Sequence, residues 1–522
     1  MEKFFFDLED LDRNSGLTIN DASLVISTTS FISSSDYNGD GIDDLIVSPI
    51  AESATQLQII YGGDELPANL DLEDLEATTK LEGDSNNSFS SLFTSDLDFN
   101  GDGIDDLAYI TSEGTTSDEI DFSSQLILGK EDLPTTIDLG GLDGDNGLDF
   151  VSEFALTFAQ SVNINGDEVD DLIFLATDLE SLEPNSTGYV FFGDESDFDS
   201  TLDPTDVNGR NGFKIETKAG FLSFGVADDL NGDGFNDLSI NFFSLDRSEN
   251  TASILFGGEA FPAVVDLDDL DSDDGFTIVS RDADENSLLA PFLIEDINGD
   301  ETADLYVMQQ TGGEAEIFII FGNETFDATL ELADLNGDNG FSIVNSDREE
   351  TSMIINSALD LNNDGLQDLV IKDRASNDTY VVFGQSEFEA EIDLADLNGD
   401  DGFILAEAAS FEYAVSFAGD INGDAIDDLI LETDSDLTYV VFGRDDDFGA
   451  EFDPTEDTNT LAISAQSEII VIRDIIDLNG DGADDIVYEP FFPLETLQGT
   501  DLETDIPDIQ VVYGDTDLAT AS

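Results

Sequence analysis

The sequence predicts an all-β protein, an eight-bladed β-propeller with four-stranded antiparallel blades. One acidic loop, first seen at residues 36–45, recurs from Asp98, Asn163, Asp229, Asp296, Asp360, Asp420 and Asp477, in steps of 57 to 67 residues. Between the loops lie short β-branched and aromatic runs bounded by Gly, Asn and Asp, which is the signature of strands. A repeat of this length is typical of one propeller blade.

The repeat at residues 330–386 shows the parts of one unit. A turn-rich segment, 330–340, precedes runs at 341–344 and 353–358. The acidic loop from Asp360 follows, and then come runs at 369–371 and 380–383. The last run is continuously apolar, which suits a strand covered on both faces. We therefore expect a single domain, 1–522, whose repeats are approximately 1–65, 66–131, 132–197, 198–260, 261–325, 326–387, 388–446 and 447–522.

The two ends of the chain predict how the ring closes. The chain opens with a strand at residues 16–19 and ends just after a closing strand at 511–514. Neither has a complete blade of its own. Pairing Leu17–Ile19 with 509–513 would complete the final blade and remove two exposed sheet edges. Seven blades with one displaced unit are the alternative.

The net charge of the chain limits the classes of partner that we expect. Lys and Arg total 14 and Asp and Glu total 122, which gives a net charge of −108. Such a field repels nucleic acid and anionic membranes, so we expect no nucleic-acid partner. The sequence contains no run of 18 apolar residues, so we expect no membrane insertion. Cysteine is absent, and residues 1–7 lack the apolar core of a signal peptide. We expect a monomer or part of a larger chain.

The acidic loops predict metal binding. A side-chain oxygen stands at loop positions 1, 3, 5 and 9 in every copy, and position 7 offers a backbone carbonyl. This alternation suits calcium, which takes six to eight oxygen ligands. The predicted ligands are Asp36, Asn38, Asp40, Ile42, Asp44; Asp98, Asn100, Asp102, Ile104, Asp106; Asn163, Asn165, Asp167, Val169, Asp171; Asp229, Asn231, Asp233, Phe235, Asp237; Asp296, Asn298, Asp300, Thr302, Asp304; Asp360, Asn362, Asp364, Leu366, Asp368; Asp420, Asn422, Asp424, Ile426, Asp428; and Asp477, Asn479, Asp481, Ala483, Asp485.

Neighbouring positions separate ligands from bystanders. Position 12 is apolar or Tyr throughout, so the loop joins two strands and the ninth-position Asp must supply the closing carboxylate. Position 8 varies among Asp, Asn, Ala and Gln, whereas position 9 is always Asp. Because the chain turns sharply at position 6, Gly is expected there. Glu168, Glu301 and Ala425 break that rule, and Asn163 removes a charge. We expect up to eight calcium ions, with five strong loops and weaker ones at Asn163, Asp296 and Asp420.

A second acidic turn, at residues 334–340 and 396–402, is expected to bind no metal. Its equivalent at 206–212 carries Arg210, which would repel a cation, and no ninth-position Asp follows. We interpret these segments as turns that precede a strand.

Two recurring sequence motifs resemble those of a known family. The segment 417–430, Phe-Ala-Gly-Asp-Ile-Asn-Gly-Asp through Asp-Leu-Ile, and the segment 439–443, Tyr-Val-Val-Phe-Gly, resemble the FG-GAP repeat of integrin α-subunit propellers. The segment 392–403 is similar to FG-GAP arrays of bacterial and cyanobacterial surface proteins. The resemblance covers about residues 6–515. It implies a calcium-stabilised propeller, extracellular or at the cell surface, used in adhesion or recognition. Residues 48–50 depart from the "GAP" word, and integrin propellers have seven blades.

Three functions compete. The first is an extracellular binding or adhesion module that presents a protein or glycan ligand site on a propeller face, with loops such as 111–124 and 490–506 as candidate contacts. The alternatives are a lectin or a carbohydrate-active enzyme resembling the calcium-containing polysaccharide lyases. His and Cys are absent, so Ser/His/Asp and Cys/His arrangements are impossible. A two-carboxylate hydrolase stays open. With basic residues thin and scattered, we expect that the chain is not an enzyme.

Overall fold

The computed structural model describes twenty-five stretches of the chain. They are residues 4–7, 11, 15–20, 32–47, 56–63, 66–71, 78–83, 87–93, 97–113, 121–151, 155–177, 186–194, 198–217, 220–226, 228–244, 250–280, 288–311, 314–347, 352–405, 415–432, 437–445, 448–457, 459–464, 469–491 and 509–514.

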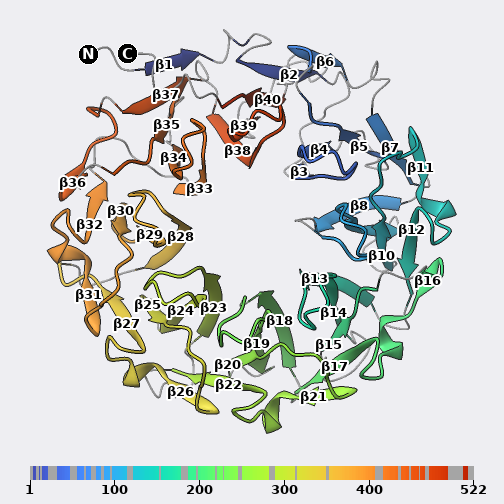
Figure 1. Cartoon of the computed structure of the whole chain (residues 1–522), viewed down its shortest axis with the longest axis horizontal. Helices are drawn as coiled ribbons and strands as arrows, with labels where there is room; N and C mark the ends of the chain where they lie inside the picture. Colours follow the sequence, from blue (N-terminus) through green and yellow to red (C-terminus); the bar gives the residue numbers. More distant parts are fainter. Residues whose placement is uncertain are drawn as a thin grey trace, which may run out of the picture.

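Eight small sheets form a closed ring around a central axis (Figure 1). The predicted all-β, eight-bladed propeller is confirmed, and the seven-bladed alternative is wrong. In each blade the chain runs outward from the axis through antiparallel neighbours, so the first strand after each crossover lies innermost. Within the described residues, no helix is long and apolar enough to cross a membrane.

Strand bounds repeat from blade to blade. The innermost strands are β3 (Ile32–Ser35), β8 (Asn87–Phe93), β13 (Ala155–Val162), β18 (Gly220–Val226), β23 (Leu288–Ile294), β28 (Met353–Leu359), β33 (Val415–Gly419) and β38 (Ile469–Ile476). The second strands are β4 (Asp44–Val47), β9 (Leu107–Glu113), β14 (Asp171–Thr177), β19 (Leu238–Ser244), β24 (Asp304–Thr311), β29 (Asp368–Asp373), β34 (Asp428–Glu432) and β39 (Asp485–Phe491).

The outer half of each blade follows the same plan. The third strands are β5 (Gln56–Ile60), β10 (Asp121–Ile127), β15 (Ser186–Phe191), β20 (Asn250–Leu255), β25 (Glu314–Ile320), β30 (Asp378–Val382), β35 (Leu437–Val441) and β40 (Ile509–Val512). The fourth strands are β7 (Thr78–Glu82), β12 (Gly147–Phe150), β17 (Gly212–Glu216), β22 (Gly275–Val279), β27 (Gly340–Val344), β32 (Gly402–Leu405), β37 (Thr460–Ser464) and β2 (Gly16–Asn20).

Within the part of the chain that the structure describes, each sheet has five strands, one more than we predicted. Short strands pair in parallel with the fourth strand of a blade: β11 (Thr136–Asp138), β16 (Thr201–Leu202), β21 (Val264–Asp266), β26 (Thr329–Glu331), β31 (Glu391–Asp393), β36 (Glu451–Phe452), β1 (Phe4–Asp7) and β6 (Asn69–Asp71). Several lead into 3₁₀ turns, η2 (Leu139–Gly141), η3 (Pro204–Asp206), η4 (Leu267–Asp269), η5 (Leu332–Asp334) and η6 (Leu394–Asp396). The turn-rich segment thus covers an outer edge that would otherwise be open to pairing.

The ring closes as predicted. β2 pairs antiparallel with β40, with Leu17 opposite Val511 and Ile19 opposite Ile509. The structure adds a second closure that the sequence did not predict. β1 pairs in parallel with β37, with Phe4 opposite Leu461. The N-terminal segment therefore contributes strands to two blades formed by the end of the chain.

The apolar core lies between neighbouring blades. One cluster joins Ile317 and Ile319 of β25 to Ile371 of β29 in the next blade, all nearly fully buried. Crossover phenylalanines add to these interfaces: Phe388 stacks on Phe341 of the preceding blade at 4.4 Å between ring centroids, and Phe261 stacks on Phe213 at 4.3 Å. Burial on both faces explains continuous apolar runs such as 317–320 in β25, where every side chain is buried.

A buried glutamate links the last two blades and gives a pH-dependent contribution to stability. Glu432 of β34 accepts a hydrogen bond from the backbone N–H of Ile472 in β38, at 2.7 Å. Burial raises its pKa to about 6, against an opposing effect of that N–H and of Arg473. Because the folded-state pKa lies above the unfolded value, the folded state gains stability at low pH and loses it as pH rises through about 6.

Replacement of Glu432 by Gln should remove this dependence, since Gln keeps an acceptor oxygen and stays neutral. The unfolding free energy of the variant relative to wild type should increase by about 1 kcal/mol between about pH 5 and 7.5. Denaturant titrations at several pH values measure this difference. A difference that stays constant with pH would contradict the assignment.

Candidate metal loops and the seams between blades

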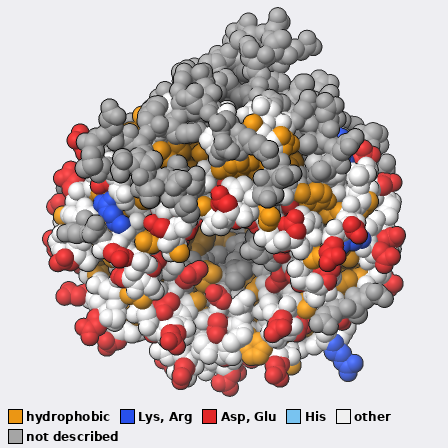
Figure 2. Space-filling view, turned by 45° about the horizontal axis from the view of Figure 1, so that its top comes forward, with side chains coloured by type: hydrophobic (Ala, Val, Ile, Leu, Met, Phe, Trp, Pro, Cys, Tyr) orange, Lys and Arg blue, Asp and Glu red, His pale blue; other side chains and the backbone are white. Residues whose placement is uncertain are grey.

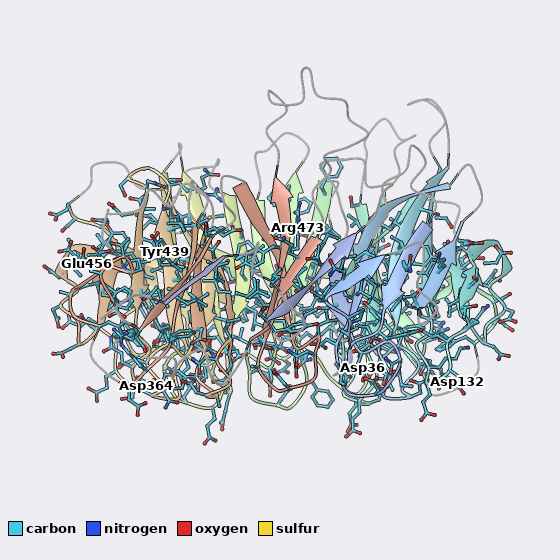
Figure 3. The ribbon with its side chains drawn as sticks, turned by 90° about the horizontal axis from the view of Figure 1, so that it is seen from above. Asp36, Asp132, Asp364, Tyr439, Glu456 and Arg473 are labelled. Carbon is cyan, nitrogen blue, oxygen red and sulfur yellow. The ribbon has the colours of Figure 1, made fainter. Side chains whose placement is uncertain are left out.

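All eight acidic loops lie at one face of the ring. Each connects an innermost strand to the second strand of the same blade, and Figure 3 shows Asp36 and Asp364, from blades far apart in the ring, at the same edge. The ninth-position Asp opens or immediately precedes the second strand, as at Asp44 of β4 and Asp106 before β9. The fold therefore places all the predicted metal ligands as eight similar loops, each a separate site within its own blade.

The ninth-position carboxylate is the anchor of each loop. In the first loop, Asp44 accepts hydrogen bonds from the backbone N–H of Tyr37 at 3.1 Å and of Gly62 at 2.9 Å. These donors stand at loop position 2 and just after the third strand. Six further loops repeat both contacts, and in the eighth Asn479 donates in place of the position 2 residue. A Cβ at Gly62 would lie 2.3 Å from the carbonyl oxygen of Asp43, which explains the glycine.

These carboxylates are almost completely buried. Asp44, Asp171, Asp237, Asp304, Asp368, Asp428 and Asp485 are each 0% exposed, and Asp106 is 1% exposed. Burial is the largest cause of a raised pKa, to about 8 for Asp44 and about 9 for Asp485, against the lowering effect of the glycine N–H. Repulsion from the carboxylates at loop positions 1 and 5 raises the pKa further. A buried carboxylate near two others is stable at neutral pH only with a proton or a cation.

The first and fifth positions shape the loop. Asp36 accepts hydrogen bonds from the N–H groups of Gly39 and Gly41, each at 2.7 Å, and Asp40 accepts from Ile42 at 3.0 Å. Equivalent bonds recur in the other loops that begin with Asp. The loop thus curls around its first carboxylate, with oxygen-bearing side chains at positions 1, 3 and 5.

The donor set fits a hard cation. Asn422, at position 3, is 1% exposed, and its Nδ2 lies 3.3 Å from both carboxylate oxygens of Asp428. Its Oδ1 is buried without a hydrogen-bond partner. An amide oxygen with no donor, beside a buried carboxylate, is a suitable ligand for Ca²⁺. Among the described residues, no three acidic, His or Cys side chains converge by themselves, so an ion here would need the Asn oxygen and the position 7 carbonyl.

The three loops without Gly at position 6 keep the turn. Glu168, Glu301 and Ala425 have φ of 70°, 71° and 64°, in the left-handed region that Gly41 occupies at 82° in the first loop. Ala425 still donates its N–H to Asp420 at 2.6 Å. The substitutions therefore store backbone strain, and the loop path is preserved.

Exchanging these residues should change stability with opposite signs. Ala425→Gly should raise the unfolding free energy by about 1 kcal/mol, because Gly adopts positive φ without strain. Gly41→Ala should lower it by a similar amount, since a Cβ there meets no atom within 4 Å and only the backbone conformation changes. Denaturant melts of both variants measure the pair. Equal signs would refute the strain.

The second acidic turn precedes a strand, as expected. Gly337 donates its N–H to the carbonyl of Gly340, the first residue of β27, at 2.8 Å, and the backbone N–H of Asp338 donates to Oδ1 of Asn336 at 3.1 Å. Gly399 repeats the first contact with Gly402.

Position 8, which the sequence pattern left without a role, joins the loop to the preceding one in five blades through an Asp side chain. Asp105 accepts from the backbone N–H of Asp36 at 3.0 Å and from the Ser35 hydroxyl at 2.6 Å. In return, Asp105 donates its own N–H to the carbonyl of Asp36 at 3.2 Å. Asp170, Asp427 and Asp484 accept in the same way, and Asp43 accepts from Asp477 where the ring closes.

The other three seams differ in chemistry. Ala303 keeps a backbone bond to Asp229, at 3.4 Å, and has no polar side chain. Gln367 donates to Glu295 instead, at 3.0 Å. The third of these loops has Asn236 at position 8. The recurrence of Asp at five of the eight copies was the signal in the sequence. The sequence alone does not reveal its role, because the hydrogen-bond partner belongs to another repeat.

The loops expected to contact a partner lie partly outside the described residues, which leave out 114–120 and 492–508. The visible surface carries many acidic side chains and a few separate Lys and Arg (Figure 2). The partner surface stays a prediction.

Comparison with known proteins identifies no family. No protein-family model matches the chain, and no curated protein does. One similar solved structure is a β-fructofuranosidase from Schwanniomyces occidentalis complexed with fructosyl-erythritol, at 9% identity and a TM-score of 0.24, covering 98% of this chain and 96% of that one. Another is a substituted fructofuranosidase from the same organism complexed with fructosylnystose, at 9% identity and a TM-score of 0.22, covering 99% and 97%.

These matches correct one expectation. We expected that the chain is not an enzyme, and the matched structures are both fructofuranosidases. That exclusion is therefore withdrawn. At such a TM-score the likeness assigns no catalytic residue, substrate or reaction to this chain.

Proposed function

We propose that the chain is a calcium-stabilised propeller that works as an extracellular or cell-surface binding module. The observation that carries the calcium part is the set of eight buried ninth-position carboxylates, each within a loop of alternating oxygen donors. Burying an isolated negative charge is costly, and a divalent cation offsets that cost while it satisfies the orphan oxygen of Asn422. The FG-GAP-like words support the same interpretation.

The roles of the residues follow from the loop geometry. The side chains at positions 1, 3, 5 and 9 and the carbonyl at position 7 would hold the ion, as the donor set of each loop allows. Calcium would supply charge neutralisation at the anchor carboxylate. The anchor fixes the N–H groups of the loop and of the closing glycine, so an ion there would stiffen three strand ends in every blade.

Binding of a partner is the second part of the proposal. Calcium loops on one face leave the opposite ends of the blades, and the outer rim, for recognition. The net charge of −108 favours cationic partners and disfavours nucleic acid.

Calcium should raise the melting temperature of the chain, and the rise should depend on Asp237 more than on Asn236. At calcium a hundredfold above Kd, one loop contributes about 3 kcal/mol of stability. Asp237→Ala removes an anchor and should lose that contribution, whereas Asn236→Ala, at the adjacent position 8, should retain most of it. Melting curves with calcium and with EDTA at low salt give both readouts. An unchanged melt in EDTA, or equal effects of the two substitutions, would contradict the metal assignment.

Carbohydrate recognition is a second candidate, favoured by two exposed aromatic side chains. Phe221 of β18 is 40% exposed and Phe292 of β23 is 42% exposed, on innermost strands of neighbouring blades. The ring of Phe292 stacks on Tyr306 of β24 at 4.8 Å, which fixes its orientation. Exposed, oriented aromatic faces suit stacking against an apolar ring face of a ligand.

A glycan array in calcium tests this candidate. If sugars bind there, Phe221→Ser and Phe292→Ser should weaken binding about tenfold or more, because stacking surface is lost. Val279→Ser is the matched control, since Val279 is 39% exposed but lies on the outer strand β22. Turnover of polyuronates and fructosyl oligosaccharides is measured on the same samples. Absence of glycan binding and of turnover would leave the binding-module proposal alone.

A further inference from the structure

A cavity opens at the outer rim of the ring, within the crossover that leaves β20. Its volume is about 300 Å³. The residues that line it include the apolar Phe256, Phe261 and Leu270 and the acidic Asp269, Asp273 and Asp274. This volume is at the small end for ligand sites, so it suits one side chain better than a whole cofactor.

Two other blades place a cationic side chain of their own at the matching position. The residue after the glycine that follows the third strand is Lys130 in one blade, Arg444 in another and Gly258 beside the cavity. The three are equivalent, because each donates its backbone N–H to the position 2 residue of the preceding loop: Lys130 to Tyr37 at 3.2 Å, Arg444 to Leu361 at 2.9 Å and Gly258 to Ile164 at 3.0 Å.

Arg444 shows how the matching space accommodates a guanidinium group. Its guanidinium carbon lies 4.3 Å from the ring centroid of Phe448 and 5.4 Å from that of Phe452. It forms an ion pair with Asp457 at 3.3 Å. Phe448 and Phe261 are equivalent, since each stacks on the fourth strand of the preceding blade, on Phe403 at 5.1 Å and on Phe213 at 4.3 Å.

Lys130 reaches the turn that precedes the fourth strand of its own blade. Its Nζ donates to the carbonyl of Asp145 at 2.8 Å. The next residue, Asn146, accepts the N–H of Leu128, as Asp274 accepts that of Phe256 beside the cavity. Asp273 and Asp274 therefore occupy the places of Asp145 and Asn146. The blade with Gly258 keeps the aromatic ring and the acidic turn, and glycine stands in place of the cationic residue.

We propose that this cavity, hereafter the Gly258 pocket, binds the arginine side chain of a partner polypeptide, with the guanidinium group against Phe261 and the carboxylates of Asp273 and Asp274. The charge of the rim agrees, because the lining residues in the described part of the chain include acidic residues and no basic one. Burial and then repulsion from Asp271 and Asp273 raise the pKa of Asp274, and a bound cation would relieve that repulsion. This inference rests on the proposed binding function and names the chemistry of the partner.

Filling the pocket from within tests the proposal. A Cβ at Gly258 would meet no atom within 4 Å, so Gly258→Arg can be introduced without a backbone clash and should occupy the pocket as Arg444 occupies its own. Gly258→Ser is the matched control, which alters the backbone residue and leaves the pocket open.

The probe is a fluorescein-labelled peptide, Gly-Gly-Arg-Gly-Gly, followed by fluorescence anisotropy with the full chain in calcium and about 0.3 M salt, which screens unspecific attraction to the acidic surface. Wild type and Gly258→Ser should bind with similar Kd, and Gly258→Arg should bind about tenfold more weakly or not at all. The same peptide with citrulline, a neutral isostere, should also bind about tenfold more weakly. A lysine peptide that binds as well as the arginine peptide would overturn the preference for guanidinium. Equal binding by Gly258→Arg or of the citrulline peptide would overturn the pocket.

The reverse substitution gives a second readout that needs no partner. Arg444→Gly should open an equivalent space between Phe448 and Asp457 and lower the melting temperature. Added methylguanidinium, at about 10 mM, should restore part of the loss in this variant and leave wild type unchanged. Absence of rescue would count against the guanidinium preference of these compartments, and if the variant does not fold, the peptide experiment on Gly258 decides alone.

The outcomes separate this inference from the proposed function. Peptide binding together with a melting temperature that EDTA does not change would contradict the calcium assignment and support the pocket. A calcium-dependent melt without peptide binding would sink the pocket and leave the calcium assignment standing.

Discussion

The structure depends on one buried carboxylate in each blade. The ninth-position aspartate lies at the start of the second strand, where its oxygens accept N–H groups from the loop before it and from the glycine after the third strand. Three strand ends thus converge on a single side chain. The same burial that makes these hydrogen bonds effective makes the negative charge expensive, so a proton or a cation must accompany the fold. In a chain with 122 acidic residues, this local requirement is repeated eight times within one face.

Contacts between successive blades turn eight units into one body. The parallel fifth strands, the crossover phenylalanines and the position 8 side chains all act across a boundary between repeats. Most loops are therefore held partly by the next loop along the chain, and the contact between Asp43 and Asp477 joins the last loop to the first. Acidic side chains serve here as hydrogen-bond acceptors for backbone N–H groups, so much of the acidity within the loops is structural.

The blades share one regular frame but differ at equivalent positions. Where Arg444 or Lys130 occupies the compartment between crossover and turn, the blade supplies its own cation. Where Gly258 stands, the same compartment is a cavity with an acidic border. Such a difference can be compared directly in a repeat protein, because equivalent positions share nearly the same backbone geometry.

The sequence by itself determined the strand pattern, the number of blades, the closure of the ring by Leu17–Ile19 and the separation of position 9 from position 8. These features are periodic or local, so spacing and residue type are sufficient to predict them. Tertiary structure alone decided the fifth strand of each sheet, the pairing of Phe4 with Leu461, the role of Asp105 and its equivalents, and the pocket beside Gly258. Each of these joins residues from different repeats, and a periodic pattern states what each unit contains without stating which surface of its neighbour it will meet.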